Sequence, residues 1–240
     1  MQQLFILWLL MMVSSVVKAE CNINHSQLRA EYQLQTFKNG QAIQTSPLVL
    51  WRNGNTVAHQ FPNTEITESW FLLNNKQIKP TRFFDHYQRA IEYQPGEKVH
   101  GKTEKDWDYR YQLISASLLP QLTLSAESGS GCQKEQTYSK STDNTTIVLK
   151  WLPELQLVSS FSSTRGDIKE TWQLTSQQYD QAAIEHFFTE LSQYQSTDYA
   201  DIGDDHTDPF LAKMINLGFV EHGASGFYNT DGQPIEGGHH

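Results

Sequence analysis

An acidic segment near the C-terminal end of the chain combines carboxylates with an imidazole. The segment Asp201-Ile202-Gly203-Asp204-Asp205-His206-Thr207-Asp208 carries four carboxylates and one histidine within eight residues. Oxygen-rich clusters of this kind can bind a divalent cation. The spacing does not fit the EF-hand loop, which needs a glycine at its sixth position and a terminal glutamate. A solvated linker, in which Asp208 caps the next helix, explains the same residues and is the interpretation that the sequence favours.

Histidines gather in the same part of the chain. Four of the nine histidines lie in the last 35 residues: His206, His222, His239 and His240. Imidazoles ligate Zn²⁺ and Cu²⁺, and a terminal His-His pair beside glycines can reach a metal. The histidines lack i,i+4 helical spacing and an accompanying cysteine. Two interpretations stay open. Either these four histidines form a divalent-metal site with Asp208, or they lie in a flexible tail and bind no metal. The sequence implies no other cofactor.

Motifs of the common catalytic classes are missing from the sequence. Gly223-Ala224-Ser225-Gly226 lacks the G-x-S-x-G spacing of a nucleophile elbow. There is no phosphate-binding glycine loop and no H-E-x-x-H motif. Asp106 and Asp108 lie two residues apart, which is not the arrangement of a carboxylate pair on facing walls of a cleft. We therefore do not expect an enzyme.

The first 19 residues have the pattern of an export signal. The apolar run Leu4 to Val13 has ten residues, which make about 15 Å of helix at about 1.5 Å per residue. That is half of the roughly 30 Å hydrocarbon core of a membrane. Val17-Lys18-Ala19 is an acceptable cleavage site. We predict a mature protein that starts at Glu20, is periplasmic or secreted, and has no transmembrane segment.

Two cysteines, Cys21 and Cys132, remain in the predicted mature chain. An even pair in an oxidising compartment predicts one disulfide. The absence of a Cys-x-x-Cys motif argues against the alternatives, a metal pair or a catalytic thiol. By the chain-entropy model a bridge that closes a loop of this length stabilises the fold by up to about 4–5 kcal/mol.

Charge divides the chain into two unequal parts. The 240 residues carry a net charge of −9, which disfavours nucleic acid as a partner because carboxylates repel phosphates. Residues 20–169 hold 16 basic and 15 acidic side chains, whereas residues 170–240 hold 12 acidic ones and only Lys213 as a base. We predict an antiparallel β domain over residues 20–175, an acidic helical segment over 176–218 and a flexible tail over 219–240.

The first part reads as strands and turns. Leu28 to Thr36 alternates apolar or Thr residues with polar ones, the period of a sheet with one wet face. Asn39-Gly40 predicts a turn, and Asn53-Gly54 predicts a hairpin with a type I′ turn. The Ser/Thr/Gly-rich stretch Ser125 to Thr146 predicts a long loop. We expect further strands at 47–51, 56–61, 68–73, 81–85, 89–93, 146–151, 155–161 and 168–174, the last two as a hairpin.

Helices are expected at three places. A helical insertion is compatible with Tyr111 to Leu119, which ends before Pro120. Ser176 is a plausible N-cap for a helix whose apolar stripe includes Ile184 and Leu191. Asp208 as cap, Pro209 at the first helical position and Gly218 after the last turn predict a short third helix.

The end of the β domain resembles a known periplasmic family. Trp151-Leu152-Pro153 precedes a strand–turn–strand with Arg165-Gly166-Asp167 at its turn, a pattern similar to that of LolA-like half-barrel proteins and related uncharacterised periplasmic domains. The resemblance covers roughly residues 27–175. It implies a curved antiparallel sheet, or incomplete β-barrel, whose concave side is plugged by a helix. It also implies a carrier of hydrophobic ligands or lipoproteins, although no ligand residue of the family can be transferred.

Aromatic side chains on the predicted strands have two interpretations. Trp51, Trp70, Phe83, Tyr87 and Tyr93 fill the core, which the sequence favours, or they line a concave apolar cavity. We expect a mainly β protein that binds an apolar ligand, lipid or peptide on a curved sheet, or assists in envelope maintenance. The alternative is a metal-handling protein that uses the C-terminal histidines.

Overall fold

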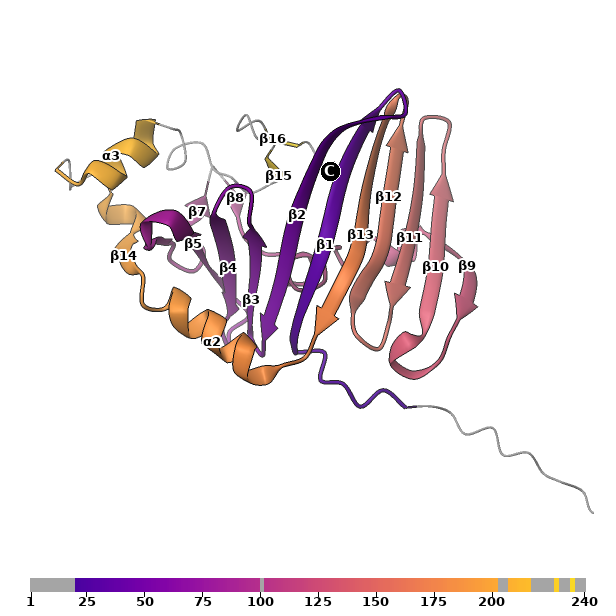
Figure 1. Cartoon of the computed structure of the whole chain (residues 1–240), viewed down its shortest axis with the longest axis horizontal. Helices are drawn as coiled ribbons and strands as arrows, with labels where there is room; N and C mark the ends of the chain where they lie inside the picture. The colour runs from indigo at the N-terminus through magenta and orange to yellow at the C-terminus, as the bar shows by residue number, and fades with distance from the viewer. Residues whose placement is uncertain (1–19, 100–101, 203–206, 217–226, 229–233, 236–240) are drawn as a thin grey trace, which may run out of the picture.

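The computed structural model describes residues 20–99, 102–202, 207–216, 227–228 and 234–235. These residues form one curved, unclosed sheet of 12 strands in the order β14-β6-β5-β4-β3-β2-β1-β13-β12-β11-β10-β9 (Figure 1). Neighbouring strands are antiparallel except for β14, which pairs with β6 in parallel. The expected fold class, a mainly β protein with a curved open sheet and a C-terminal helical segment, is confirmed.

Two meanders meet at the centre of this sheet. The first consists of β1 (Gln27–Lys38), β2 (Gln41–Asn53), β3 (Thr56–Phe61), β4 (Ile66–Leu72), β5 (Ile78–Phe84) and β6 (Arg89–Glu92). The second consists of β9 (Thr123–Ser128), β10 (Glu135–Ser141), β11 (Thr145–Leu152), β12 (Leu157–Arg165) and β13 (Ile168–Gln178). Between them lie the short pair β7 (Lys98–Val99) and β8 (Lys102–Thr103), and α1 (Trp107–Gln112). A second short pair, β15 (Phe227–Tyr228) and β16 (Pro234–Ile235), lies near the end of the chain.

Both expected turns after β1 and β2 are present, but their types differ. Asn39 and Gly40 have φ angles of 51° and 77°, the two positive values of a type I′ turn. In the β2–β3 hairpin, Asn53 still pairs with Thr56, so Gly54 and Asn55 are the central residues. Of these two only Gly54 has a positive φ, which is the pattern of a type II′ turn. The predicted type I′ turn is therefore wrong here, because the register keeps Asn53 in the strand.

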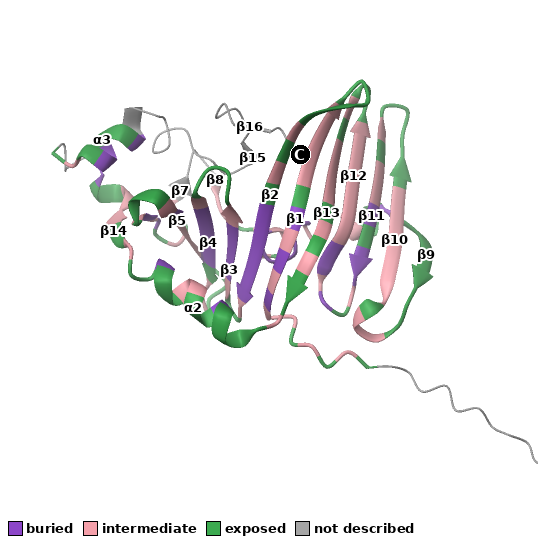
Figure 2. Cartoon of the chain, viewed as in Figure 1, coloured by how far each residue is buried: buried purple, intermediate pink, exposed green. Residues whose placement is uncertain are grey.

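The sheet has an α1 face and an α2 face, named after the helix that each one contacts. Leu50 and Val57 point to the α1 face, within the largest apolar cluster of the molecule. Their sequence neighbours Trp51 and Ala58 point to the α2 face and pack against Ile184 of α2 (Gln181–Leu191). Burial concentrates at one end of the long strands, whereas the far ends of β1, β2, β12 and β13 are partly or fully exposed (Figure 2).

The acidic C-terminal segment wraps around the β6 edge of the sheet. After α2, β14 (Gln195–Asp198) extends that edge, and η4 (Tyr199–Asp201) and α3 (Pro209–Asn216) follow. Phe210 and Leu211 of α3 pack on Ile91 of β6. The Asp208 carboxylate accepts hydrogen bonds from the amides of Phe210 and Leu211, and Arg89 pairs with it at 2.6 Å. The predicted cap at Asp208 and helix start at Pro209 are confirmed.

The second helix starts later than expected. Its N-cap is Asp180, whose carboxylate accepts hydrogen bonds from the amides of Ala182 and Ala183. The predicted cap, Ser176, is wrong because β13 continues to Gln178 along its pairing with β1. Ile184 and Leu191 of the expected stripe are buried, which confirms the face that packs on the sheet.

Two further expectations for the β domain are wrong. The stretch Ser125 to Thr146 is not a loop, because it holds most of β9, all of β10 and the start of β11. Backbone pairing makes these strands although β9 is exposed along its whole length. The helical insertion is α1, which starts after the cap Asp106 and ends at Leu113, a residue with φ of 66°. Only a single 3₁₀ turn, η2 (Leu119–Gln121), follows.

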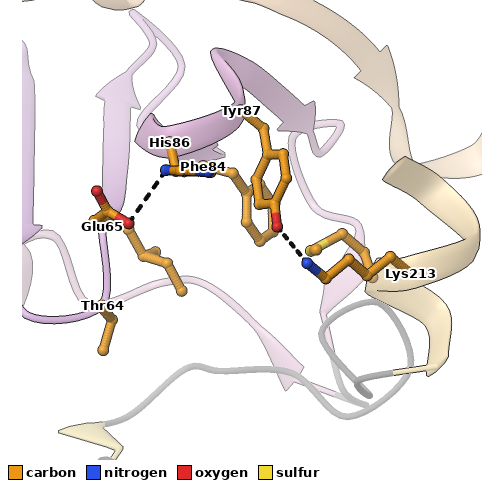
Figure 3. Close-up of a pocket in the computed structure, with 8 residues that line it drawn as sticks. Thr64, Glu65, Phe84, His86, Tyr87 and Lys213 are labelled. Carbon is orange, nitrogen blue, oxygen red and sulfur yellow. Dashed lines mark hydrogen bonds and ion pairs between the residues drawn. The ribbon is translucent and has the colours of Figure 1, made fainter. Parts of the chain in front are cut away.

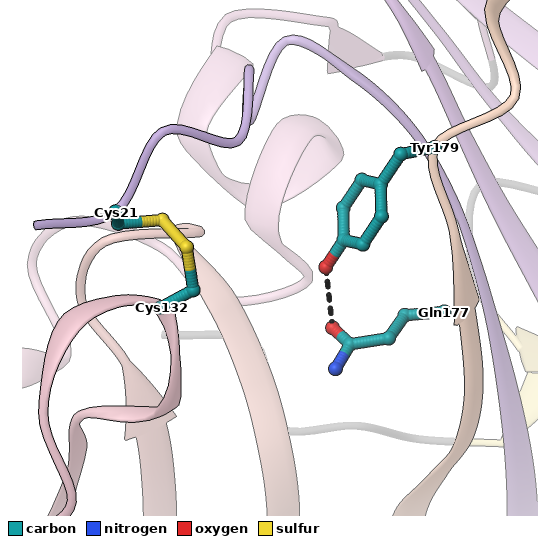
Figure 4. Close-up of a disulfide and its surroundings, with 4 residues drawn as sticks. All are labelled: Cys21, Cys132, Gln177 and Tyr179. Atoms are coloured by element: carbon teal, nitrogen blue, oxygen red, sulfur yellow. Dashed lines mark hydrogen bonds between the residues drawn. A yellow bond between two sulfur atoms is a disulfide. The ribbon is translucent and has the colours of Figure 1, made fainter. Parts of the chain in front are cut away.

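The predicted disulfide is present. Cys21 and Cys132 are bonded, with their Cα atoms 4.6 Å apart (Figure 4). Cys132 belongs to η3 (Gly131–Gln133), so the bridge ties the start of the described chain to the β9–β10 connection. A structural disulfide is typical of proteins outside the cytoplasm. Among the described residues, no helix has the length and hydropathy needed to span a membrane.

Candidate ligand-binding surface

A buried arginine, Arg52, connects several segments that pack on the α1 face. Arg52 of β2 is fully buried. Its Nε donates to the Tyr111 carbonyl at 2.7 Å, and Nη1 donates to the carbonyls of His25 and Leu155. Nη2 donates to the Gln156 carbonyl at 2.6 Å. Burial lowers the pKa of Arg52 to about 10. The guanidinium therefore joins the N-terminal segment, α1 and the β11–β12 turn to the sheet.

A second polar cluster lies on the same face, over strands β3 to β5. Arg82 donates to Glu68 at 2.6 Å in a buried ion pair. His59 Nε2 lies 2.7 Å from the Arg110 carbonyl of α1. Burial, followed by the nearby Arg110 charge, lowers the pKa of His59 to about 3. The imidazole is therefore neutral and donates its N–H to that carbonyl. The Arg110 guanidinium also lies 4.2 Å from the centre of the Trp70 ring, so α1 packs on this region of the sheet.

The other half of the α1 face carries a continuous row of apolar side chains, which we call the apolar row. It crosses six strands through directly opposed residues: Leu34, Trp172, Phe161, Leu149, Tyr138 and Leu124. At about 4.8 Å between neighbouring strands, the five steps span about 24 Å. The sequence of pairings places the row between the buried core and the exposed strand ends.

Exposure differs among the residues of the apolar row. Leu149 is fully buried, whereas Trp172, Phe161 and Tyr138 are partly exposed. Leu124, on the edge strand β9, is 46% exposed. The Phe161 and Trp172 rings lie 4.6 Å apart, centre to centre. The row is thus a stripe of packed apolar side chains whose outer surface is open to solvent.

The next row toward the strand ends is mostly polar. It consists of Thr36, Glu170, Ser163, Ile147 and Lys140, again directly opposed across neighbouring strands. Burial raises the pKa of Glu170, which Arg165 partly offsets. A ligand on the apolar row would therefore meet apolar atoms along its length and hydroxyl and charged groups along one side.

A separate cavity lies at the opposite end of the sheet. It has a volume of about 290 Å³ and is bounded by the β3–β4 connection, by η1 (Asp85–Tyr87) and by α3 (Figure 3). Its polar lining residues are Thr64, Glu65, His86, Tyr87 and Lys213. This cavity shares no residue with the apolar row.

The aromatic residues singled out from the sequence do not converge on one site. Trp51 and Phe83 are buried on the α2 face, where Trp51 stacks on Phe187 at 3.9 Å. Trp70 is buried on the α1 face, and Tyr93 packs on Tyr199. Tyr87, which is 40% exposed, lines the cavity described above. The first four lie where the core interpretation places them, and a ligand role for the set stays a prediction.

The predicted metal ligands are only partly placed. Asp208 caps α3 and pairs with Arg89, so its carboxylate already has partners. His206, His222, His239 and His240 lie outside the described residues. Within the described ranges, no three histidine, cysteine or carboxylate side chains form a group that could hold a metal. A metal site on the C-terminal segment therefore stays a prediction.

Sequence reasoning missed the apolar row because two of its six residues lie on strands in or beside the predicted loop. Tyr138 and Leu124 belong to β10 and β9, inside or beside the Ser/Thr-rich stretch. Phe161 and Trp172, by contrast, are directly opposed in the β12–β13 hairpin that the sequence predicts. That register alone indicates one aromatic pair on the α1 face.

Comparisons with known proteins give a limited likeness in fold. No protein family matches the sequence, and no curated protein is similar to it. Two crystal forms of PNGF-II match with a TM-score of 0.36, at 11% and 12% identity over 74% and 71% of this chain. This chain spans about a third of PNGF-II, with 32% and 31% covered. A putative outer membrane lipoprotein-sorting protein domain from Vibrio parahaemolyticus matches with a TM-score of 0.32, at 6% identity over 70% of this chain and 92% of that one.

Proposed function

We propose that this protein is an exported binding protein that holds an elongated apolar ligand, a lipid chain or an apolar peptide, along the apolar row. The observation that carries the proposal is the alignment of directly opposed apolar side chains over six strands, open to solvent on one side. Contiguous apolar surface that stays exposed in a folded protein marks sites of interaction.

The dimensions of the apolar row suit an extended ligand better than a compact one. The apolar row is about 24 Å long, and the adjacent row toward the strand ends is mostly polar. Trp172 and Phe161 lie near its middle, where aromatic rings offer the largest apolar contact area. Covering these rings removes apolar surface from water, which stabilises a complex by roughly 25 cal/mol per Å².

The Cys21–Cys132 disulfide supports a location outside the cytoplasm. We propose the periplasm or the extracellular medium as that location, reached through residues 1–19 as a signal peptide. N-terminal sequencing of exported protein should find Glu20 first. An exported chain that still begins at Met1 would contradict this part of the proposal.

Binding of a fluorescent fatty acid to the purified full chain tests the function. Phe161→Gln and Trp172→Gln place an amide in the apolar row and should each weaken binding by about tenfold, or about 1.4 kcal/mol. The matched control is Val148→Gln, on β11 but on the α2 face, because Val148 is also partly exposed. Equal affinity of all three variants and the wild type, with unchanged circular dichroism, would exclude the apolar row as the binding surface.

Native mass spectrometry of protein purified from its own compartment identifies the ligand class. A retained lipid or a retained apolar peptide supports the proposal and selects between the two. Protein that is free of both, and that also fails to bind the fatty acid, contradicts it.

A further inference from the structure

The cavity beside η1 contains the single basic residue of the acidic C-terminal part. Residues 170–240 carry 12 acidic side chains and one base, Lys213. Lys213 projects from α3 into the cavity, where its ammonium group donates a hydrogen bond to the Tyr87 hydroxyl (Figure 3). The ammonium also lies 5.0 Å from the centre of the Tyr87 ring. No carboxylate of the described residues forms an ion pair with it.

The Tyr87 hydroxyl can still donate a hydrogen bond. Its oxygen accepts the hydrogen bond from Lys213, so its own proton is free to be donated. Lys213 has two further N–H donors. An ammonium and a phenol side by side therefore present several donors in one place, which suits a carboxylate oxygen pair.

Glu65 also lines this cavity, but its carboxylate contacts His86 and forms no ion pair with Lys213 within the described residues. His86 lies 3.6 Å from Glu65, and both side chains are more than 60% exposed. Glu65 therefore faces the imidazole rather than the ammonium, as the dashed lines in Figure 3 show. The positive charge of Lys213 is consequently available to an incoming anion.

The floor of the cavity is apolar. Ile66, Phe84 and Met214 line it, and Phe84 and Met214 are 4% and 2% exposed as whole residues. A volume of about 290 Å³ accommodates on the order of ten non-hydrogen atoms, if each occupies about the 30 Å³ of a water molecule. A ligand that fills it is therefore small and has an apolar body and one anionic end.

We propose that this cavity binds a small apolar monocarboxylate, with its carboxylate on Lys213 and Tyr87 and its apolar body against Phe84 and Met214. A free alkanoic or aromatic acid and the C-terminal residue of a peptide share this chemistry. The inference is independent of the proposed function, because the cavity and the apolar row have no residue in common.

Met214 provides a local signal for the test. The chain has four methionines, and the other three, Met1, Met11 and Met12, lie near its N-terminal end. Full-length protein with ¹³C-labelled methionine methyl groups is titrated with octanoate and with N-acetylphenylalanine, and Met214→Leu assigns the resonance. We expect saturable shifts of the Met214 signal with both acids. Tighter binding of octanoate would indicate a free acid as the ligand, and tighter binding of N-acetylphenylalanine would indicate the C-terminal residue of a peptide. The neutral amides of both compounds should bind at least about tenfold more weakly.

Two variants assign the polar contacts. Lys213→Gln should weaken octanoate binding by about tenfold or more, and Tyr87→Phe should weaken it by a smaller factor. Lys169→Gln, which removes an exposed lysine on β13, is the matched control and should bind like the wild type. Trp172→Gln should also leave the Met214 shift unchanged, which separates this site from the apolar row.

Three results would overturn the inference. The first is a Met214 signal that does not respond to millimolar octanoate. The second is octanamide binding as tightly as octanoate, and the third is Lys213→Gln binding as tightly as the wild type. Loss of fatty-acid binding to the apolar row, by contrast, affects only the proposed function.

Discussion

The guanidinium of Arg52 lies 4.0 Å from the centre of the Tyr111 ring, while its Nε donates to the carbonyl of the same residue. Tyr111 in turn donates its hydroxyl proton to the His25 carbonyl at 3.2 Å, and Arg52 donates to that carbonyl as well. Two side chains thus hold β2, α1 and the segment before β1 in one arrangement. Within the described chain, no carboxylate forms an ion pair with Arg52, so backbone carbonyls and the aromatic ring compensate its buried charge.

Replacing Arg52 should destabilise the protein strongly. Arg52→Met removes the side-chain donor of four backbone carbonyls, of which that of His25 keeps the Tyr111 hydroxyl as a donor. We expect the free energy of unfolding to fall by about 3 kcal/mol or more. Arg52→Lys should recover little, because one ammonium group cannot reach all four carbonyls. Urea unfolding measures both, with the exposed Arg165→Gln as control. A loss below about 1 kcal/mol for Arg52→Met would contradict the role of this side chain.

Removal of the disulfide should also lower stability. The double variant Cys21→Ser/Cys132→Ser frees the N-terminal segment from η3, and we expect a loss of up to about 4–5 kcal/mol. Denatured wild-type protein prepared without reductant should show no titratable thiol. Two titratable thiols, or identical unfolding of the wild type and the double variant, would be incompatible with a structural bridge.

His59 should make the fold sensitive to acid. Its folded pKa of about 3 lies below the ordinary value of 6.5, so the unfolded chain takes up a proton that the folded protein excludes. Its stabilising contribution is complete above about pH 6.5 and decreases as the pH falls toward 3, by up to about 1.4 kcal/mol per pH unit. His59→Gln should reduce this slope in urea unfolding between about pH 6 and pH 4. A His59→Gln variant with the same slope as the wild type would contradict this assignment.

Asp85 should have the opposite dependence. Burial raises the pKa of its carboxyl group to about 6, and its Oδ1 is buried without a hydrogen-bond partner in the described structure. The protonated form is favoured in the folded state, so the stabilising contribution is complete below about pH 4 and is lost as the pH rises through 6. We expect Asp85→Asn to be more stable than the wild type by about 1 kcal/mol near pH 8, a value reduced for partial solvent screening.

The comparison at low pH checks this assignment. Near pH 4 the wild-type carboxyl is protonated, so the advantage of Asp85→Asn should vanish. Asp143→Asn, in an exposed turn, is the control. A difference between Asp85→Asn and the wild type that stays constant from pH 4 to pH 8 would show that ionisation of Asp85 is not its cause.

Local signals predicted those parts of the fold that local chemistry determines. Asn39-Gly40 formed its turn because only such residues adopt two positive φ angles readily. Asp208 and Pro209 marked a helix start because capping depends on neighbouring amides alone. The cysteine pair could be assigned because the chain offers one partner to each cysteine.

Features that depend on distant partners could not be predicted. β9 and β10 have few apolar residues, and they are strands because each pairs with its neighbour in the sheet. β14 joins the edge in parallel after a helix crosses the α2 face, which no pattern within Gln195–Asp198 indicates. Arg52 carried one usable signal, because a charged residue directly after Leu48 to Trp51 in an apolar strand needs buried partners.

The position of β1 has a consequence for the order of folding. β1 lies between β2, its neighbour in sequence, and β13, which comes near the other end of the β domain. Each meander can form from consecutive hairpins, whereas the β1–β13 pairing must close a loop that contains most of the chain. Such closure is entropically costly and slow. We therefore expect the two half-sheets to form first and their joining at β1 and β13 to limit the folding rate, so that the apolar row, which crosses this seam between Leu34 and Trp172, is completed last.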